Sequence, residues 1–205
     1  MSPAAPAGAG DEAALVAAAR AGDRRALETL LGLAYDRAWP VCRRICGSEA
    51  DAADAAQEAL ILVMRNLERF DGRSRFSTWV YRIATNASLD ELRRRRRRPR
   101  PDDGTLLGHA AHDTALGPAV IHPDDVAAAR VDVDRALAAI PPEFRAALAL
   151  RELAGLDYAE IGEVLGIPPG TVRSRIARGR AALAAQISGP SGNSPGVDER
   201  PRDHA

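Results

Sequence analysis

Residues 157–183, DYAEIGEVLGIPPGTVRSRIARGRAAL, decide the fold of the C-terminal part of the chain. Asp157 is suited to cap a first helix, on which Ile161 faces inward. Gly166 can supply the turn after this helix, and Pro169 stands in the first turn of a second helix, where proline is tolerated. The order of cap, helix, turn and helix predicts a helix-turn-helix.

The second helix of this motif separates into two faces when it is laid out at about 100° per residue. Apolar and small residues gather within about 80° of one another and predict the packed face: Val172, Ile176, Gly179, Leu183 and Ile187. The opposite face is basic with small residues at its centre, and no acidic residue interrupts it. Such a face can enter the major groove of DNA, where arginine bonds guanine edges and serine or arginine holds phosphates. The predicted DNA-binding residues are Thr171, Arg173, Ser174, Arg175, Ala177 and Arg178.

A solvated basic face on a packing helix is the alternative interpretation of these arginines. It accounts for the charge, but less well for the glycine turn, the inward apolar set and the absence of acids together. DNA binding is therefore the favoured prediction for this segment.

Composition favours an all-α protein. Of 205 residues 46% are hydrophobic but only 4% aromatic, and all 28 basic residues are arginine. Cores built from Ala, Leu, Val and Ile suit packed helices. The formal net charge is zero, so only a local concentration of charge can attract nucleic acid. No apolar run approaches the ~20 residues of a membrane span, and the N-terminus lacks the pattern of a signal peptide, so we expect a cytoplasmic protein without membrane insertion of its own.

The pattern along the chain predicts two small helical domains joined by a flexible linker. The expected segments are a disordered N-terminus at 1–10, a helical domain at 11–98, a linker at 99–123, a helix-turn-helix domain at 124–187 and a disordered tail at 188–205. The linker is predicted from its proline, glycine and histidine content and from its lack of a helical period.

Local signals predict where the helices begin and end. Asp11 is expected to cap a short helix that ends near residue 21, and Asp23 a second helix that Pro40 kinks or breaks. Ser48, with an acidic residue three positions on, resembles a capping box. We expect a further helix over residues 76–98, and three short helices near residues 142–154, 157–165 and 169–187.

The N-terminal half carries a resemblance to a known family. Residues 51–98, DAADAAQEALILVMRNLERFDGRSRFSTWVYRIATNASLDELRRRRRR, resemble the second conserved region of the extracytoplasmic-function (ECF) sigma factors. Residues 136–187 resemble the fourth region, with GTVRSRI in its usual place. The resemblance implies an alternative RNA polymerase sigma factor, which binds core polymerase, recognises −35 and −10 promoter elements and promotes strand opening.

The resemblance also implies roles for residues in this half. Asp54, Gln57 and Glu58 fall where these factors dock on the polymerase, and an acidic face on an apolar-backed helix suits a basic partner helix. A solvated acidic face is the alternative. The residues that fall where the family captures the −10 element as single strand are Asp71, Ser74, Phe76, Asn86, Asp90 and Arg93.

Individual residues of this −10 set allow more than one interpretation. The amide of Asn86 can bond the edge of a flipped base, although it can equally serve as a capping amide. Trp79 is expected in the core, whereas Phe76 fits either the core or a stacking role. The arginine run at 93–98 can contact phosphates, with Arg93, Arg94 and Arg96 as candidates, or form a solvated, frayed helix end. Many family members carry a bulky aromatic residue where this chain has Ala177, so the resemblance implies no particular −35 sequence.

The expected partners are core RNA polymerase, promoter DNA and, as the resemblance implies, an anti-sigma protein. We expect no cofactor, no metal and no catalytic residue, since no nucleophile elbow, P-loop or zinc-protease motif is present. A zinc or redox site built from Cys42, Cys46 and the linker histidines is conceivable, but buried packing is the default for such cysteines.

Two alternatives of other classes remain open from the sequence. The first is a helix-turn-helix regulator whose N-terminal bundle senses a signal or dimerises, and the second is a helical adaptor without a role on DNA. Residues 51–98 speak against the regulator, which has no reason to carry them. The arginines of the recognition helix would be dispensable in the adaptor.

Overall fold

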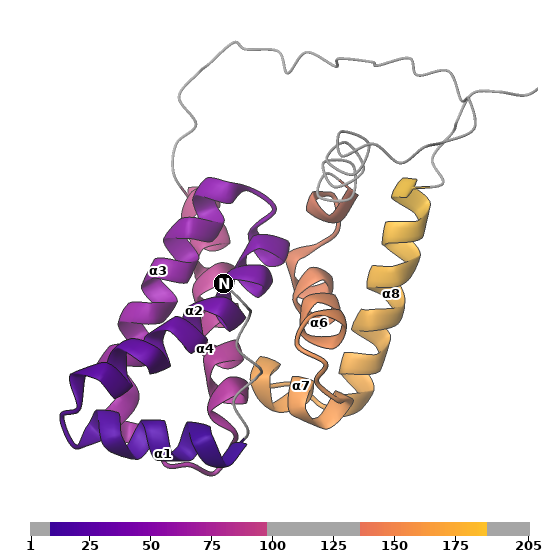
Figure 1. The fold of residues 1–205 in the computed structure, drawn as a ribbon. Helices are drawn as coiled ribbons and strands as arrows, with labels where there is room; N and C mark the ends of the chain where they lie inside the picture. The colour runs from indigo at the N-terminus through magenta and orange to yellow at the C-terminus, as the bar shows by residue number, and fades with distance from the viewer. Residues whose placement is uncertain (1–8, 98–135, 188–205) are drawn as a thin grey trace, which may run out of the picture.

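The structure of the chain is a computed structural model, and it describes residues 9–97 and 136–187. Every regular element in these ranges is a helix, as predicted (Figure 1). The helices are α1 (Ala9–Arg20), α2 (Arg24–Cys46), α3 (Glu49–Asn66), the 3-10 turn η1 (Leu67–Arg69), α4 (Phe76–Arg97), α6 (Pro142–Glu152), α7 (Tyr158–Leu165) and α8 (Pro169–Ile187). Helices α1–α4 form one group and α6–α8 a second. The predicted linker and C-terminal tail lie outside the described residues.

The N-terminal helices follow most of the predicted signals. Asp23 caps α2 by accepting hydrogen bonds from the backbone N–H groups of Arg25 and Ala26, at 2.9 and 3.2 Å. Ser48 caps α3 through the N–H of Asp51 at 3.2 Å. The Asp51 carboxylate pairs with Arg95 of α4, so it ties the start of α3 to the end of α4.

One local expectation is wrong, and one of the two alternatives for Pro40 is excluded. Helix α1 begins at Ala9, so Asp11 lies in its first turn and is not its cap, and residues 1–8 lie outside the described residues. Helix α2 runs through Pro40 without a break, because Ala38, Val41 and Cys42 on either side are buried against neighbouring helices. Packing on this scale outweighs the one backbone hydrogen bond that a proline removes.

The N-terminal core combines small residues with one aromatic cluster. Alanines on α2 and α3 are fully buried and let these helices approach closely. Phe70, Phe76 and Trp79 pack together within this core, with ring centroids 5.1–5.9 Å apart. Trp79 is 8% exposed, which confirms its predicted place in the core.

The C-terminal group forms the predicted helix-turn-helix. Asp157 and Glu160 make a reciprocal capping box at the start of α7. Gly166 ends α7 with a φ of 64°, a left-handed conformation that glycine adopts without strain. A Cβ on Gly162 would lie 2.8 Å from the Ile167 carbonyl oxygen, so glycine at this position permits the close approach of the two segments.

The two groups share a core, which the sequence did not predict. Val41 and Ile45 of α2 are buried in the same cluster as Leu150 of α6 and Ile161 of α7, and Leu89 of α4 packs against it. The physical reason is that α2 has two apolar sides: Cys42 and Cys46 face the N-terminal core, whereas the residues beside them face α6.

Polar contacts reinforce this packing. Arg75, just before α4, forms an ion pair with Glu160 of α7. Arg145 of α6 is 5% exposed, and its guanidinium lies against Gly47 at the C-terminus of α2, the end of a helix that attracts cations.

Candidate functional site

Helix α8 carries the candidate duplex-reading face. Val172 and Ile176 are 0% and 2% exposed. Gly179 is also buried, and it packs so closely on α6 that a Cβ there would lie 2.7 Å from a methyl group of Leu148. Leu183 is half-buried, whereas the side chain of Ile187 lies outside the described set. These residues form the predicted packed side of the helix.

The opposite side of α8 faces solvent. Arg173, Ser174, Ala177 and Arg178 are exposed, and Thr171 and Arg175 on the flanks are half-buried. Helix α8 contains four arginines and no acidic residue. The structure therefore brings the six predicted residues together on one basic surface.

Contacts hold part of this surface in place. The hydroxyl of Ser174 donates to the carbonyl oxygen of Thr171 at 2.9 Å. Arg180 forms an ion pair with Glu152 of α6 at 2.6 Å, and this hydrogen bond raises the pKa of Arg180. Arg180 was not among the predicted site residues, although its seven-residue spacing from Arg173 places both on one stripe of the helix.

The candidate polymerase-binding residues lie on the outer side of α3. Asp54, Gln57 and Glu58 are all exposed, while alanines on the opposite side of the helix are buried. Met64, 50% exposed and seven residues beyond Gln57, extends this side with an apolar group. Met64 was not among the predicted site residues, although its seven-residue spacing from Gln57 places both on one side of the helix.

The candidate −10 residues fall into two separate groups. Asp71 and Ser74 lie in the loop before α4, where the Asp71 carboxylate accepts a hydrogen bond from the N–H of Arg73 at 3.0 Å. Asn86 and the ion pair between Asp90 and Arg93 are exposed further along α4. Asn86 lies ten residues after the start of the helix, about 15 Å along its axis.

Phe76 lies in the core and not on the surface. Its ring is 3% exposed and meets Phe70 edge-on, at an interplanar angle of 85°. It lines one side of a cavity of about 320 Å³ between α1 and the loop, together with Val16 and Ser74. This cavity is large enough for a nucleobase. The sequence could not predict it because one wall comes from α1.

The arginine run at the end of α4 is helical as far as Arg97, where the helix ends. Arg94 pairs with Glu91 at 2.7 Å and Arg95 pairs with Asp51 of α3. Arg93 and Arg96 are exposed. These ion pairs stabilise the helical end, for which phosphate contact and a solvated, frayed end were the two alternatives.

The two cysteines are packing residues. Both thiols are buried and free, and burial raises the pKa of Cys42 to about 11 and that of Cys46 to about 12. Within residues 9–97 and 136–187, no cluster of three potential metal ligands occurs. The linker histidines His109, His112 and His122 lie outside these ranges. None of the described helices is both long enough and apolar enough to cross a membrane.

Comparison with known proteins places both halves in one family. Residues 33–98 match the model of Sigma-70 region 2, and residues 130–183 match that of Sigma-70 region 4. The ECF RNA polymerase sigma factor SigW of Bacillus subtilis is 33% identical over 174 residues, which cover 81% of this chain and 91% of that protein. The ECF RNA polymerase sigma-E factor of Escherichia coli is 35% identical over 179 residues, covering 84% and 92%.

A solved structure shares the fold. The sigma factor RpoE of Bartonella quintana, in complex with the anti-sigma factor NepR, superposes with a TM-score of 0.60 at 22% identity, covering 78% of this chain and 95% of that one. The two matched regions contain α8 and α4, the helices that carry the exposed basic face and Asn86. The chain therefore belongs to the ECF family of RNA polymerase sigma factors, and it directs promoter recognition by RNA polymerase.

Proposed function

We propose that α8 reads the −35 element as duplex DNA, with Thr171, Arg173, Ser174, Arg175, Ala177 and Arg178 facing the major groove. The observation that carries this proposal is the exposed, acid-free basic face of α8, backed by the buried Val172, Ile176 and Gly179. Small residues at the centre of the face let the helix approach the base edges, and arginines on its flanks reach guanines or phosphates.

The −10 element is bound as a single strand by the loop before α4 and by α4 itself. The cavity beside the loop is the place for a flipped base, with Ser74 in its lining and Phe76 as an apolar wall, and Asp71 belongs to the same loop. The exposed amide of Asn86, followed by Asp90 and Arg93, provides polar contacts along the strand.

Core RNA polymerase binds the outer side of α3. Asp54, Gln57 and Glu58 offer acceptors to a basic partner helix, and Met64 adds apolar contact area. Catalysis belongs to the polymerase, so this chain acts without active-site residues of its own. Because its partners work on the chromosome, it acts in the cytoplasm.

Reading both elements at once requires the two domains to separate. The positions −35 and −10 are about 25 base pairs apart, which corresponds to about 85 Å of B-form DNA. A packed body of this size is about 40 Å across. The α2–α6 and α4–α7 contacts must therefore open in the initiation complex.

An anti-sigma protein is a further partner. One structural neighbour was solved in complex with its anti-sigma factor, and in the present chain the two domains are packed into one body that would suit capture in an inactive form. Core polymerase and an anti-sigma protein would then compete for the chain.

Transcription of sheared genomic DNA with core polymerase tests this function. With the chain present, sequencing of the RNA 5′ ends should reveal start sites that share two upstream motifs, and these starts should vanish without it. An absence of such starts would contradict the proposal. Specific DNA binding without any effect on initiation would instead support a helix-turn-helix regulator.

Two matched pairs of variants separate the proposed surfaces. Glu58→Gln should weaken binding to core polymerase by several-fold, whereas Glu28→Gln, at an exposed glutamate on α2, should not. Asn86→Ala should lower open-complex formation while leaving duplex binding intact, and Arg178→Ala should do the reverse, at about 1–3 kcal/mol per bidentate contact. If all variants act alike, the assignment of separate surfaces is wrong.

A further inference from the structure

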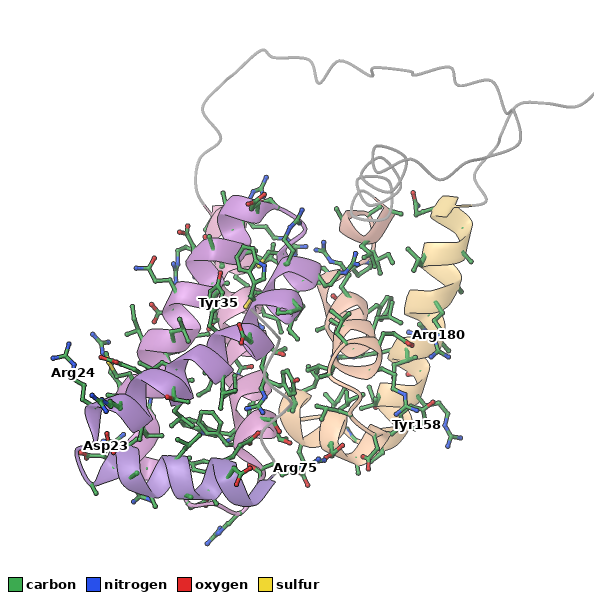
Figure 2. All side chains as sticks on the ribbon, in the orientation of Figure 1. Asp23, Arg24, Tyr35, Arg75, Tyr158 and Arg180 are labelled. Carbon is green, nitrogen blue, oxygen red and sulfur yellow. The ribbon has the colours of Figure 1, made fainter. Side chains whose placement is uncertain are left out.

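The aromatic ring at the start of the helix-turn-helix contacts the recognition helix. The guanidinium carbon of Arg173 lies 5.8 Å from the centroid of the Tyr158 ring, over its face. Figure 2 shows Tyr158, the first residue of α7, beside α8, with Arg180 further along α8. A guanidinium over an aromatic face within about 6 Å is a stabilising cation–π contact. Arg173 is therefore held on one side of the basic face, although it is exposed to solvent.

A second cation fixes the ring itself. The guanidinium carbon of Arg151 lies 5.4 Å from the same centroid. Its Nη1 also donates to the carbonyl oxygen of Leu156 at 2.8 Å, which anchors this arginine to the backbone between α6 and α7. The contacts form a chain from the backbone through Arg151 and Tyr158 to Arg173. Each member reduces the freedom of the next.

The neighbouring stripe of α8 supports the same geometry. Arg173 and Arg180 are seven residues apart and so lie on one side of the helix. Arg180 is held by Glu152 at the end of α6, and the Tyr158 phenol makes a smaller contribution to the raised pKa of Arg180. No ring or carboxylate contact of this kind is seen for Arg178 among the described residues.

We propose that Tyr158 is a positioning residue for −35 recognition, which orders the Arg173 side chain before DNA arrives. An exposed arginine that is disordered in the free protein loses side-chain entropy when it bonds a base or phosphate. An arginine already held over a ring loses less. Two cations gathered around one ring also repel each other, and a nearby phosphate relieves that repulsion. This inference rests on the proposed reading of duplex DNA by α8.

Two substitutions separate the contribution of the Tyr158 ring from that of its hydroxyl group. Tyr158→Phe keeps the ring and removes the hydroxyl, whereas Tyr158→Leu removes the ring and keeps an apolar group for the half-buried position. Circular dichroism of the full chain checks that both variants are folded. If Tyr158→Leu unfolds, Tyr158→Met provides a second apolar side chain without a ring.

The test is a double-mutant cycle on duplex DNA. The full-length chain with core polymerase is first used to select binding sites from a library of random duplexes, and every single-base variant of a selected site is then measured by competition. Tyr158→Leu should weaken binding about 3- to 10-fold, and the bases at which it relaxes specificity should be those relaxed by Arg173→Ala. In the Arg173→Ala background it should have no further effect. Tyr158→Phe should stay within about twofold of the unaltered chain.

Arg178→Ala is the matched control, because the factor by which it weakens duplex binding should multiply with the factor for Tyr158→Leu. The proposal is overturned if the effects of Tyr158→Leu and Arg173→Ala also multiply, or if Tyr158→Leu weakens all sequences equally. In the free protein, the NMR signal of the Arg173 Nε–H group should carry a ring-current shift that disappears in Tyr158→Leu. If the library yields no preferred site but the ring-current shift of Arg173 is present, the proposed reading of duplex DNA by α8 is wrong, whereas the contact between Tyr158 and Arg173 is confirmed.

Discussion

The two halves of the molecule complete their cores in different ways. Helices α1–α4 enclose a core of their own, which the aromatic cluster of Phe70, Phe76 and Trp79 closes. Helices α6–α8 bury Leu150 and Ile161 together with Val41 and Ile45 of the N-terminal half. A domain as small as the C-terminal one has little apolar surface to bury by itself. The N-terminal half therefore has a core of its own, whereas the core of the C-terminal half is completed by residues of α2.

The largest effects should come from matched core truncations. Leu30 in the N-terminal core and Ile161 in the C-terminal core are both 0% exposed. Replacing either by alanine should cost about 2–5 kcal/mol of the core it belongs to. Both tryptophans, Trp39 and Trp79, lie in the N-terminal half. In urea, fluorescence therefore follows that half alone, whereas far-UV circular dichroism follows all helices.

The two truncations should differ in which urea unfolding curves they shift, the one followed by fluorescence or the one followed by circular dichroism. Leu30→Ala should shift fluorescence and circular dichroism together, because the C-terminal half loses its support. Ile161→Ala should lower the circular dichroism signal at urea concentrations that leave the fluorescence unchanged. If Ile161→Ala moves both signals equally, the chain unfolds as one unit and the proposed asymmetry is wrong.

Two glycines should respond with opposite signs. A Cβ on Gly162 would lie 2.8 Å from the Ile167 backbone oxygen, so Gly162→Ala should cost about 1–3 kcal/mol of C-terminal stability. Gly32 lies inside α2 with nothing within 4 Å of an added Cβ. Gly32→Ala should therefore stabilise the N-terminal half by about 0.5–1 kcal/mol. The same urea titrations measure both, and a loss at Gly32 would contradict the open space seen there.

The sequence was sufficient for features that depend on local order. The caps at Asp23, Ser48 and Asp157 follow from side chains that reach their own backbone. The buried and exposed faces of α8 follow from its helical period. These signals act over a few residues, so they could be recognised without a fold.

Features that depend on distant residues were beyond the sequence. The cavity beside the −10 loop needs α1, and the shared core needs α6 to meet α2. Phe76 fitted two roles by sequence, and its buried position depends on Phe70 and Trp79 packing around it. The contact of Tyr158 with Arg173 crosses from one helix to another, so no periodicity within α8 could reveal it.

A smaller effect should appear on raising the pH. The pKa of Cys42 rises from 9.0 to about 11 by burial, so the folded chain keeps this proton at pH values where the unfolded chain releases it. Stability should therefore fall as pH rises above 9, by about 1 kcal/mol per thiol between pH 9 and 10. Both thiols belong to α2, on which both cores depend, so fluorescence and circular dichroism should shift together.

Cys42→Ala isolates the contribution of one thiol. In this variant the decline in urea midpoint between pH 9 and 10 should be about half as steep, because the buried Cys46 still titrates. A thiol-reactive dye at pH 8 should label neither cysteine in the folded chain and both in urea. Rapid labelling in the folded chain would show that the α2 packing opens readily.

The smallest effect should come from the ion pair that links the halves. Arg75 and Glu160 are 64% and 25% exposed at their side chains, so the pair contributes less than about 1 kcal/mol. Figure 2 shows Arg75 at the edge where the N-terminal helices meet α7. Arg75→Glu places two carboxylates at this edge and should reduce the ratio of packed to separated halves about two- to fivefold. Arg82→Glu, an exposed charge reversal on α4, is the control.

Spin labels on Ala53→Cys and Ala184→Cys measure this ratio through the distance between α3 and α8. Both positions are exposed, while Cys42 and Cys46 are buried and should escape labelling. Arg75→Glu should increase the population at long distances, and high salt should reproduce part of that change in the unaltered chain, because salt screens the pair. If Arg75→Glu and Arg82→Glu give the same distances, the halves are held by their shared apolar core alone. The dependence of the C-terminal half on α2 and α4 would then rest entirely on Val41, Ile45 and their neighbours.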